Sequence, residues 1–159
     1  MLPLHNEEFR RRCGFSNVTD GALPYPKERK KAEKEMEKHK IAVIGLGYVG
    51  LPLARLFSTK YETIGYDLNK DRVAALMKGH DDTLEVSDEL LQEAISRYGF
   101  RCTAELNEIK DCNIYIVAVP TPVDCNNRPD LRPLIGASET VGKVISKGDI
   151  VIYESTVYP

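Results

Sequence analysis

The sequence KIAVIGLGYVG at residues 40–50 decides the fold of this chain. Its first half is apolar, which predicts a buried parallel strand over residues 40–45. Its second half has the pattern G-x-G-x-x-G, which predicts a tight turn followed by the start of a helix. In this pattern Gly45 lets the chain leave the strand sharply, Gly47 lets a pyrophosphate approach the backbone, and Gly50 lets the helix pack close to the strand. The free N–H groups at the start of the helix would then face the phosphates.

An acidic residue ends the next predicted strand, at the distance typical of a ribose-binding carboxylate. This strand covers residues 62–67, and Asp67 lies 22 residues after Gly45. A carboxylate accepts hydrogen bonds from the adenosine ribose hydroxyls and repels the 2′-phosphate of NADP. Because Leu68 and Asn69 bring no cation beside the acid, NAD is the favoured cofactor. The alternative is that Asp67 only caps the following helix, and the sequence leaves this open.

From Lys40 onward the chain alternates strands with helices. Helices are predicted over about 48–59, 69–78, 87–98, 105–110 and 131–146, and further strands over 100–103, 113–119 and 150–153. This alternation predicts a Rossmann-type, doubly wound α/β fold, with a parallel sheet and helices on both of its faces. We expect an NAD-binding domain over residues 39–159, preceded by a polar extension over residues 1–38. The extension is interpreted as a solvated lead-in segment, with a partner-binding or membrane-surface arm as the alternative.

Unusual sequence follows three of the predicted strands. The first is the glycine turn, the second is Val119-Pro120-Thr121, and the third includes Ser155 and Thr156. Prolines also stop strands and hydroxyl residues populate turns, so a purely structural interpretation exists for each segment. Ligands of open parallel sheets bind at the carboxyl ends of the strands, however, and all three segments lie there. Their common position favours a binding role for them.

Composition limits the kind of protein. The 159 residues allow one domain with an appendage, and the hydrophobic fraction of 42% suffices for a core. The net charge of −2 lacks the basic surplus of a nucleic-acid-binding protein. The longest apolar run, near Ile114–Val119, is too short to span a membrane, and no signal peptide is evident. The three histidines are scattered, so no metal site is predicted.

Four cysteines occur in the chain, and none forms a C-x-x-C pair. They are Cys13, Cys102, Cys112 and Cys125. Disulfide frameworks and structural zinc sites use closely spaced cysteines, which this sequence lacks. Together with a nucleotide-binding fold, the pattern predicts reduced thiols and a cytoplasmic location.

Four ordered motifs run from residue 41 to residue 159. They are IAVIGLGYVGLPLA at 41–54, GYDLNKDR at 65–72, VPTPVD at 119–124 and YESTVYP at 153–159. Together they resemble the N-terminal domain of the UDP-glucose/GDP-mannose dehydrogenase family. With YESTVYP, the sequences HDDT at 80–83 and PDLRPLI at 129–135 look most like the branch that acts on UDP-N-acetylhexosamines, the galactosamine or glucosamine derivatives.

The resemblance implies an NAD-dependent oxidation of a nucleotide sugar. The C6 alcohol would become a carboxylate in two hydride transfers, which use two NAD, and the uronic acid would serve the synthesis of surface polysaccharides such as capsules. Carried onto this sequence, Tyr48 and Val49 would donate backbone N–H groups to the pyrophosphate, and Arg72 would lie beside the adenosine. Thr121 would contact the cofactor, and Thr156 would have an auxiliary catalytic role near the nicotinamide.

The chain departs from the family pattern because it stops at Pro159. Family members continue with a dimerising segment and a second domain, which holds the catalytic cysteine and the sugar-binding loops. We therefore expect a fragment without activity of its own, whose full-length protein is a homodimer. Two alternatives are considered: the cofactor domain of a β-hydroxyacid or 6-phosphogluconate-type dehydrogenase, and a non-enzymatic NAD sensor. The motifs at 119–124 and 153–159 argue against the first of these.

Overall fold

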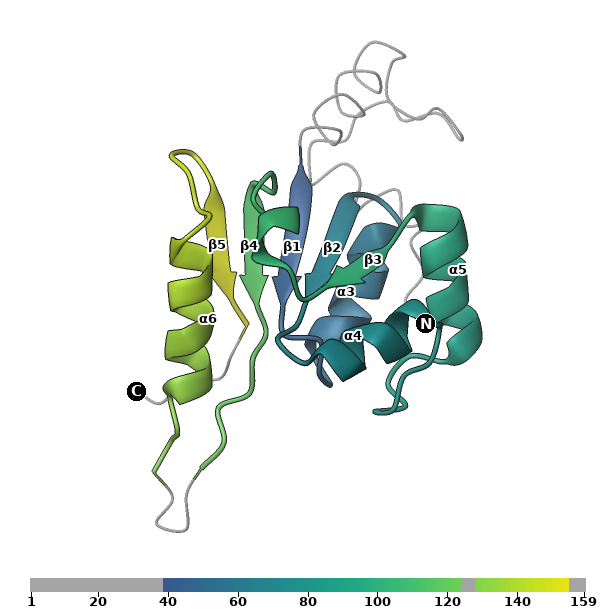
Figure 1. Ribbon diagram of the computed structural model, residues 1–159, viewed down its shortest axis with the longest axis horizontal. Coiled ribbons are helices and arrows are strands. Elements are labelled where there is room, and N and C mark those ends of the chain that lie inside the picture. The colour runs from purple at the N-terminus through teal and green to yellow at the C-terminus, as the bar shows by residue number, and fades with distance from the viewer. Residues whose placement is uncertain (1–38, 124–127, 155–159) are drawn as a thin grey trace, which may run out of the picture. The chain divides into compact units, whose positions relative to one another are not determined.

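A five-stranded parallel sheet forms the centre of the computed structural model, which describes residues 39–123 and 128–154 (Figure 1). The strands are β1 (Lys40–Ile44), β2 (Glu62–Tyr66), β3 (Arg101–Thr103), β4 (Ile114–Val117) and β5 (Ile150–Tyr153), and their order across the sheet is β3-β2-β1-β4-β5. All four pairings are parallel. This is the strand order of a doubly wound Rossmann sheet, so the predicted fold class is confirmed. The predicted extension over residues 1–38 lies outside the described residues.

Helices connect the strands at nearly the predicted positions. They are α3 (Gly50–Ser58), α4 (Lys70–Met77), α5 (Asp88–Tyr98), the 3₁₀ turn η1 (Leu106–Glu108) and α6 (Arg132–Gly142). Helix α6 ends four residues before the predicted position. After Gly142 the hydrogen-bond pattern changes from the α-helical to the 3₁₀ type, because the amides of Lys143 and Val144 donate to carbonyls three residues earlier. Such bonds close the last turn of a helix and stop its growth.

The ends of two helices follow from local side-chain chemistry. The side chain of Asn69 accepts hydrogen bonds from the amides of Asp71 and Arg72 and so caps α4. The side chain of Ser87 accepts from the amide of Leu90 and caps α5, as the sequence predicts. Gly99 ends α5 with a φ of 69°, a left-handed conformation that glycine adopts without strain.

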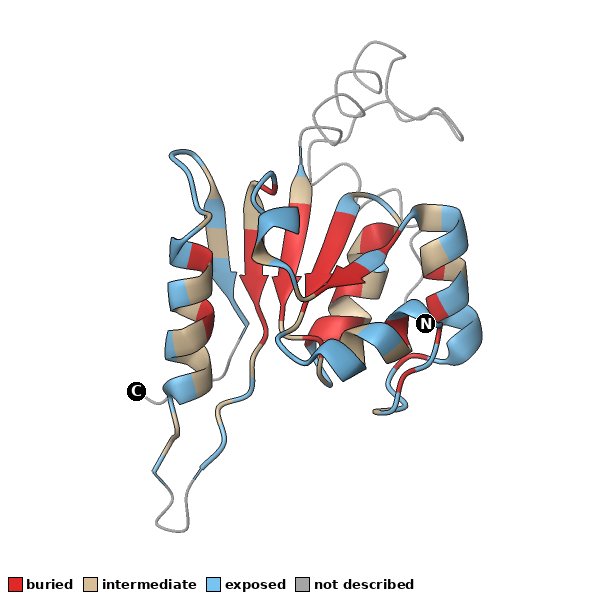
Figure 2. Cartoon of the chain, in the orientation of Figure 1, coloured by how far each residue is buried: buried red, intermediate tan, exposed pale blue. Residues whose placement is uncertain are grey.

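Apolar side chains cover both faces of the sheet. In β1, Ile41 and Val43 join one buried cluster, while Ala42 and Ile44 join another on the opposite face. The first cluster includes residues of α3 and α5, and the second includes residues of α6. Figure 2 shows the central strands as the most buried part of the described chain. Because β1 is buried on both faces, its sequence is continuously apolar instead of alternating.

Within the described residues, the longest helices have 11 residues, and none is long and apolar enough to cross a membrane. The same part of the chain contains no group of three or more acidic, histidine or cysteine side chains that could hold a metal ion.

Candidate cofactor site

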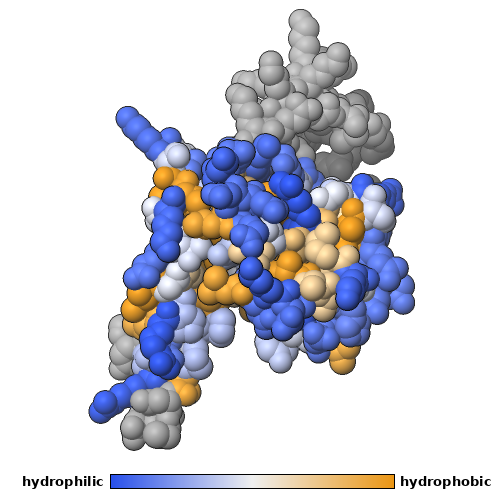
Figure 3. Space-filling model, in the orientation of Figure 1, coloured by the Kyte–Doolittle hydropathy of each residue, from blue (hydrophilic) through white to orange (hydrophobic). Residues whose placement is uncertain are grey.

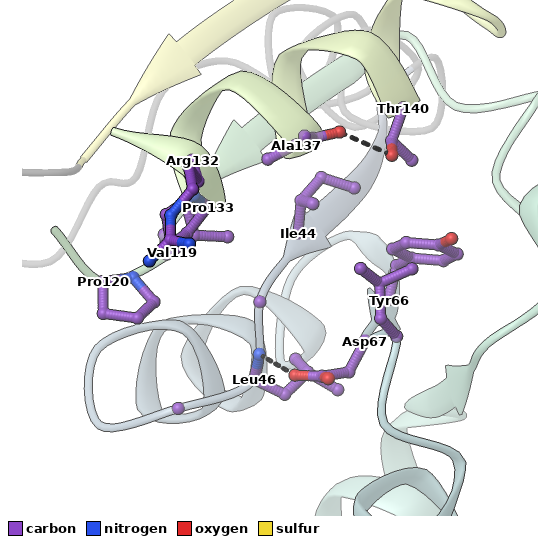
Figure 4. Close-up of a pocket in the computed structure, with 15 residues that line it drawn as sticks. Ile44, Leu46, Tyr66, Asp67, Val119, Pro120, Arg132, Pro133, Ala137 and Thr140 are labelled. Atoms are coloured by element: carbon purple, nitrogen blue, oxygen red, sulfur yellow. Dashed lines mark hydrogen bonds between the residues drawn. The ribbon is translucent and has the colours of Figure 1, made fainter. Parts of the chain in front are cut away.

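A pocket of about 330 Å³ lies where the strand order reverses, at the carboxyl ends of β1 and β4. Its walls come from the glycine turn, the end of β2, the segment after β4 and one face of α6 (Figure 4). Figure 3 shows hydrophobic surface beside α6 within a mostly hydrophilic exterior. In open α/β sheets, ligands bind at this reversal point, because the connecting segments diverge there and leave a crevice.

The three glycines of the turn have different physical roles. Gly45 has a φ of +91°, and its amide donates to the Tyr66 carbonyl over 2.8 Å. A Cβ on Gly50 would lie 1.8 Å from the Gly45 carbonyl oxygen, so only glycine allows the helix to start this close to the strand. A Cβ on Gly47 would meet nothing within 4 Å. Gly47 is therefore not needed for packing, and its missing side chain leaves open space against the backbone.

The start of α3 presents backbone donors to this space. Tyr48 is 70% exposed and Val49 is 57% exposed. Among the described residues, the amide groups of Tyr48 and Val49 find no hydrogen-bond acceptor. The first N–H groups of a helix carry a partial positive charge and bind anions well. Together with the open space at Gly47, these donors fit a pyrophosphate.

Asp67 bridges the glycine turn and the loop after β2. Its Oδ2 atom accepts from the amide of Leu46 over 2.8 Å, and its Oδ1 atom accepts from the amide of Asn69 over 2.9 Å. Asn69 itself caps α4, so the alternative that Asp67 serves only as the helix cap is wrong. The carboxylate lies in the wall of the pocket. Its contact with an adenosine ribose stays a prediction.

Arg72, predicted to lie beside the adenosine, packs beneath the glycine turn. Its Nε and Nη2 atoms donate to the Leu46 carbonyl over 3.2 and 2.9 Å. Nη2 also lies 2.7 Å from an Asp81 carboxylate oxygen. Nη1 is buried and has no partner in the described structure. The guanidinium is thus fixed to the turn, and its place beside the adenosine stays a prediction.

The segment after β4 lines both this pocket and a second one. Val119 and Pro120 lie in the wall of the first pocket. Thr121 joins them in a neighbouring cavity of about 310 Å³, whose wall also includes Gly47 and Glu154. Both cavities have Gly47, Val119 and Pro120 in their walls, so they adjoin at the glycine turn. The predicted site residues Ser155 and Thr156 lie outside the described residues.

Helix α6 forms a pocket wall that the sequence analysis did not assign to the site. Arg132, Gly136 and Thr140 line the pocket from this helix. Arg132 donates to both carboxylate oxygens of Asp130 over 2.6 to 3.0 Å, and these bonds lower the pKa of Asp130 to about 2. The signal for this wall was the i, i+4, i+8 spacing of the three residues, which places them on one helix face.

The described cysteines are unsuited to nucleophilic catalysis. Cys102 and Cys112 are buried in the two clusters on either face of the sheet. Burial raises the pKa of Cys102 to about 12 and that of Cys112 to about 11. Both stay protonated at neutral pH, whereas a nucleophilic cysteine needs its thiolate. Cys13 and Cys125 lie outside the described residues.

The fold and the site define a Rossmann dinucleotide-binding domain. Residues 39–159 match the profile of the UDP-glucose/GDP-mannose dehydrogenase family, NAD binding domain, and the chain belongs to this family. NAD is the cofactor of this domain, and the open glycine turn, its backbone donors and the acid after β2 fit that cofactor. The match favours this family over the β-hydroxyacid dehydrogenase alternative.

Known relatives place the chain more finely. It is 54% identical over 124 residues to a UDP-N-acetyl-D-glucosamine 6-dehydrogenase of Salmonella typhi. This match covers 78% of the chain and 28% of that protein. It is 55% identical over 124 residues to the protein of the same name in Pseudomonas aeruginosa, with coverage of 78% and 29%. The solved structure of a UDP-D-ManNAc dehydrogenase from Pyrococcus horikoshii superposes with a TM-score of 0.71 at 36% identity, over 76% of the chain and 29% of that structure. The chain thus spans less than a third of the length of these relatives.

Proposed function

We propose that this chain is the NAD-binding part of a nucleotide-sugar 6-dehydrogenase. The reaction oxidises the C6 alcohol of a UDP-N-acetylhexosamine to a carboxylate, and two NAD accept the two hydrides. The observation that carries the proposal is the open glycine turn at the reversal point of the sheet, in a chain 54% identical to a UDP-N-acetyl-D-glucosamine 6-dehydrogenase. The product, a UDP-linked uronic acid, would serve the synthesis of surface polysaccharides.

The residues of the site have distinct roles in this proposal. The amides of Tyr48 and Val49 hold the pyrophosphate at the start of α3, where the helix dipole favours negative charge. Asp67 accepts hydrogen bonds from the adenosine ribose, and its charge disfavours the 2′-phosphate of NADP. Thr121 and Pro120 place the nicotinamide half in the second cavity. Thr156 assists at the nicotinamide.

The location, assembly and substrate of the full-length protein are proposed from its family. The active protein is a cytoplasmic homodimer that acts on a nucleotide-sugar substrate. Substrate binding and the aldehyde-to-acid step need groups that the described residues do not provide, since Cys102 and Cys112 are buried and protonated. We therefore expect residues 1–159 alone to bind NAD and to oxidise no sugar nucleotide.

A chimera tests the proposed function. In it, the 124 matching residues of this chain replace the corresponding residues of the Salmonella typhi relative. NADH absorbance is then followed with UDP-N-acetylglucosamine, UDP-N-acetylgalactosamine and UDP-glucose. We expect turnover with at least one N-acetylated sugar and two NADH for each uronic acid.

The unaltered Salmonella typhi protein and residues 1–159 alone are the controls for this chimera. A chimera that folds and binds NAD, yet oxidises none of the three sugars while the parent is active, contradicts the proposal. Turnover by residues 1–159 alone contradicts the expectation that this part lacks the catalytic groups.

A further inference from the structure

A carboxylate that is not part of the pocket wall is buried completely. Asp81, in the loop between α4 and α5, has 0% relative exposure and does not line either cavity at the glycine turn. Removing a charged carboxylate from water is costly unless hydrogen bonds and an opposite charge replace the lost hydration. The structure supplies both kinds of compensation to Asp81.

Five donors surround the Asp81 carboxylate. Oδ1 accepts from the amide of Thr83 at 3.0 Å and from its hydroxyl at 2.7 Å, and Oδ2 accepts from the amides of Glu85 and Val86 at 3.0 Å each. The fifth donor is Nη2 of Arg72, 2.7 Å from Oδ1. The first four shape the loop itself. The fifth connects the loop to another element, and it joins two side chains that are 0% and 10% exposed.

Arg72, which binds Asp81, also contacts the glycine turn. Two of its nitrogens form a fork on the Leu46 carbonyl, at 3.2 and 2.9 Å. On the other side of the same residue, the Leu46 amide donates to Asp67 at 2.8 Å. The backbone of Leu46 is therefore held at its amide by the side chain of Asp67 and at its carbonyl by that of Arg72.

Fixing the Leu46 carbonyl also orients the amide of Gly47. The contacts of Asp81 with Arg72, and of Arg72 with the Leu46 carbonyl, are called the clamp below. The Leu46 carbonyl and the Gly47 amide belong to one planar trans peptide unit, because the described chain contains no cis peptide bond. In a trans peptide the C=O and N–H bonds point in opposite directions. Holding the carbonyl toward Arg72 therefore aims the Gly47 N–H away from Arg72. Gly47 borders both cavities at the turn, and a Cβ there would meet only open space.

We propose that Asp81 is a positioning residue for the dinucleotide: it holds Arg72, which fixes the Leu46–Gly47 peptide so that the Gly47 N–H is aimed at the pyrophosphate. This inference rests on the proposed NAD site, which it deepens. The gain is preorganisation. A donor that is already aimed loses no conformational freedom on binding, and the buried Arg72–Asp81 pair keeps its orientation more rigidly than an exposed pair.

A mutant cycle on Asp81 and Arg72 tests the inference through NAD binding, measured by calorimetry well below each variant's melting temperature. Asp81→Asn keeps the shape of the side chain but removes the charge that holds Arg72. We expect the NAD dissociation constant to rise about tenfold or more, since a hydrogen bond to a charged group contributes at least about that factor. Arg72→Gln should weaken binding at least as much. Because Asp81 acts through Arg72, the double variant should bind no more weakly than Arg72→Gln, within twofold.

A matched control separates this role from loss of stability. Tyr115→Phe removes a buried hydroxyl that donates to the Ile109 carbonyl at 3.2 Å, in the cluster on the opposite face of the sheet. It should lower stability and leave NAD affinity unchanged within twofold. A second readout needs no cofactor: the ¹⁵N–¹H signal of the Gly47 amide should shift in Asp81→Asn and stay in place in Tyr115→Phe.

The outcomes are distinct. Unchanged NAD affinity in Asp81→Asn, or a further tenfold loss when it is added to Arg72→Gln, overturns the inference. Failure of the unaltered chain to bind NAD contradicts the proposed function instead, and the Gly47 amide signal still decides whether the clamp exists. If Asp81→Asn does not fold, Thr83→Val removes the hydroxyl that bonds Asp81 and Arg72 at 2.7 and 3.2 Å. That variant should then raise the dissociation constant severalfold, and an unchanged value overturns the inference.

Discussion

Two glycines of the same turn should respond to substitution in opposite ways. A Cβ on Gly50 would lie 1.8 Å from the Gly45 carbonyl oxygen and 3.0 Å from its carbonyl carbon. Since both contacts are to backbone, no side-chain rotation relieves them, and the helix and the strand must separate by about 1.5 Å to reach van der Waals contact. Overpacking of this kind costs roughly 3 kcal/mol. For a domain of this size that lowers the melting temperature by about 10 °C.

Gly47→Val should leave stability intact and remove cofactor binding. Gly47 is not among the described residues with positive φ, so a side chain brings no backbone strain, and its Cβ meets nothing within 4 Å. Substitutions that meet no neighbouring atoms and strain no backbone change stability by about 0.5 kcal/mol or less. The added methyl groups occupy the space through which the pyrophosphate would approach the backbone. Both NAD and NADP should therefore lose measurable affinity.

Thermal melting by circular dichroism and calorimetric titration with NAD test this pair. Gly142→Ala, near the end of α6, serves as the control, because its Cβ also meets nothing within 4 Å and Gly142 does not line the pocket. It should bind NAD like the unaltered chain and melt at the same or a slightly higher temperature, because alanine is favoured over glycine in a helix. Normal NAD affinity in Gly47→Val, or an unchanged melting temperature in Gly50→Ala, would refute the assignment of separate roles to the two glycines.

Other features of the chain give further predictions. Asp67→Ala should remove most of the preference for NAD over NADP in calorimetric titration, and equal or tighter NADP binding by the unaltered chain would contradict the role of the carboxylate. The pKa of Asp81 falls from 3.8 to about 2 on folding because its hydrogen bonds, chiefly from Thr83, outweigh burial, which acts to raise it. Its stabilisation is thus complete above pH 3.8 and lost as the pH falls toward about 2, so acid should reduce the unfolding free energy of the unaltered chain more steeply than that of Asp81→Asn; equal slopes would count against this. Cys102 and Cys112 should resist iodoacetamide at pH 8 until urea unfolds the chain, as peptide mass spectrometry would show, and rapid labelling of the folded chain would disagree. Deletion of residues 1–38 should move the melting temperature by only a few degrees, since these residues contain few apolar side chains at core spacing; aggregation of the shortened chain would disprove this.

Local chemistry determined the fold and the place of the site. The apolar run at residues 40–44, the glycine spacing and the caps at Asn69 and Ser87 act over a few residues, so their structures can be predicted from the sequence. The alternation of strands and helices then restricts the chain to a parallel sheet with right-handed crossovers. That topology brings the segments after β1, β2 and β4 to one edge, which is where the pocket lies.

Contacts between distant residues were decided by the tertiary structure. Asp67 reaches the Leu46 amide across 21 residues, and Arg72 reaches the Leu46 carbonyl across 26. No local pattern distinguishes an acid that holds a turn from one that caps a helix, because the same carboxylate serves either purpose. Likewise, HDDT at residues 80–83 is a polar turn in the sequence, yet packing buries Asp81 completely while Asp82 stays exposed. Burial depends on which elements close over a residue, and only the folded chain brings Arg72 close enough to neutralise that charge.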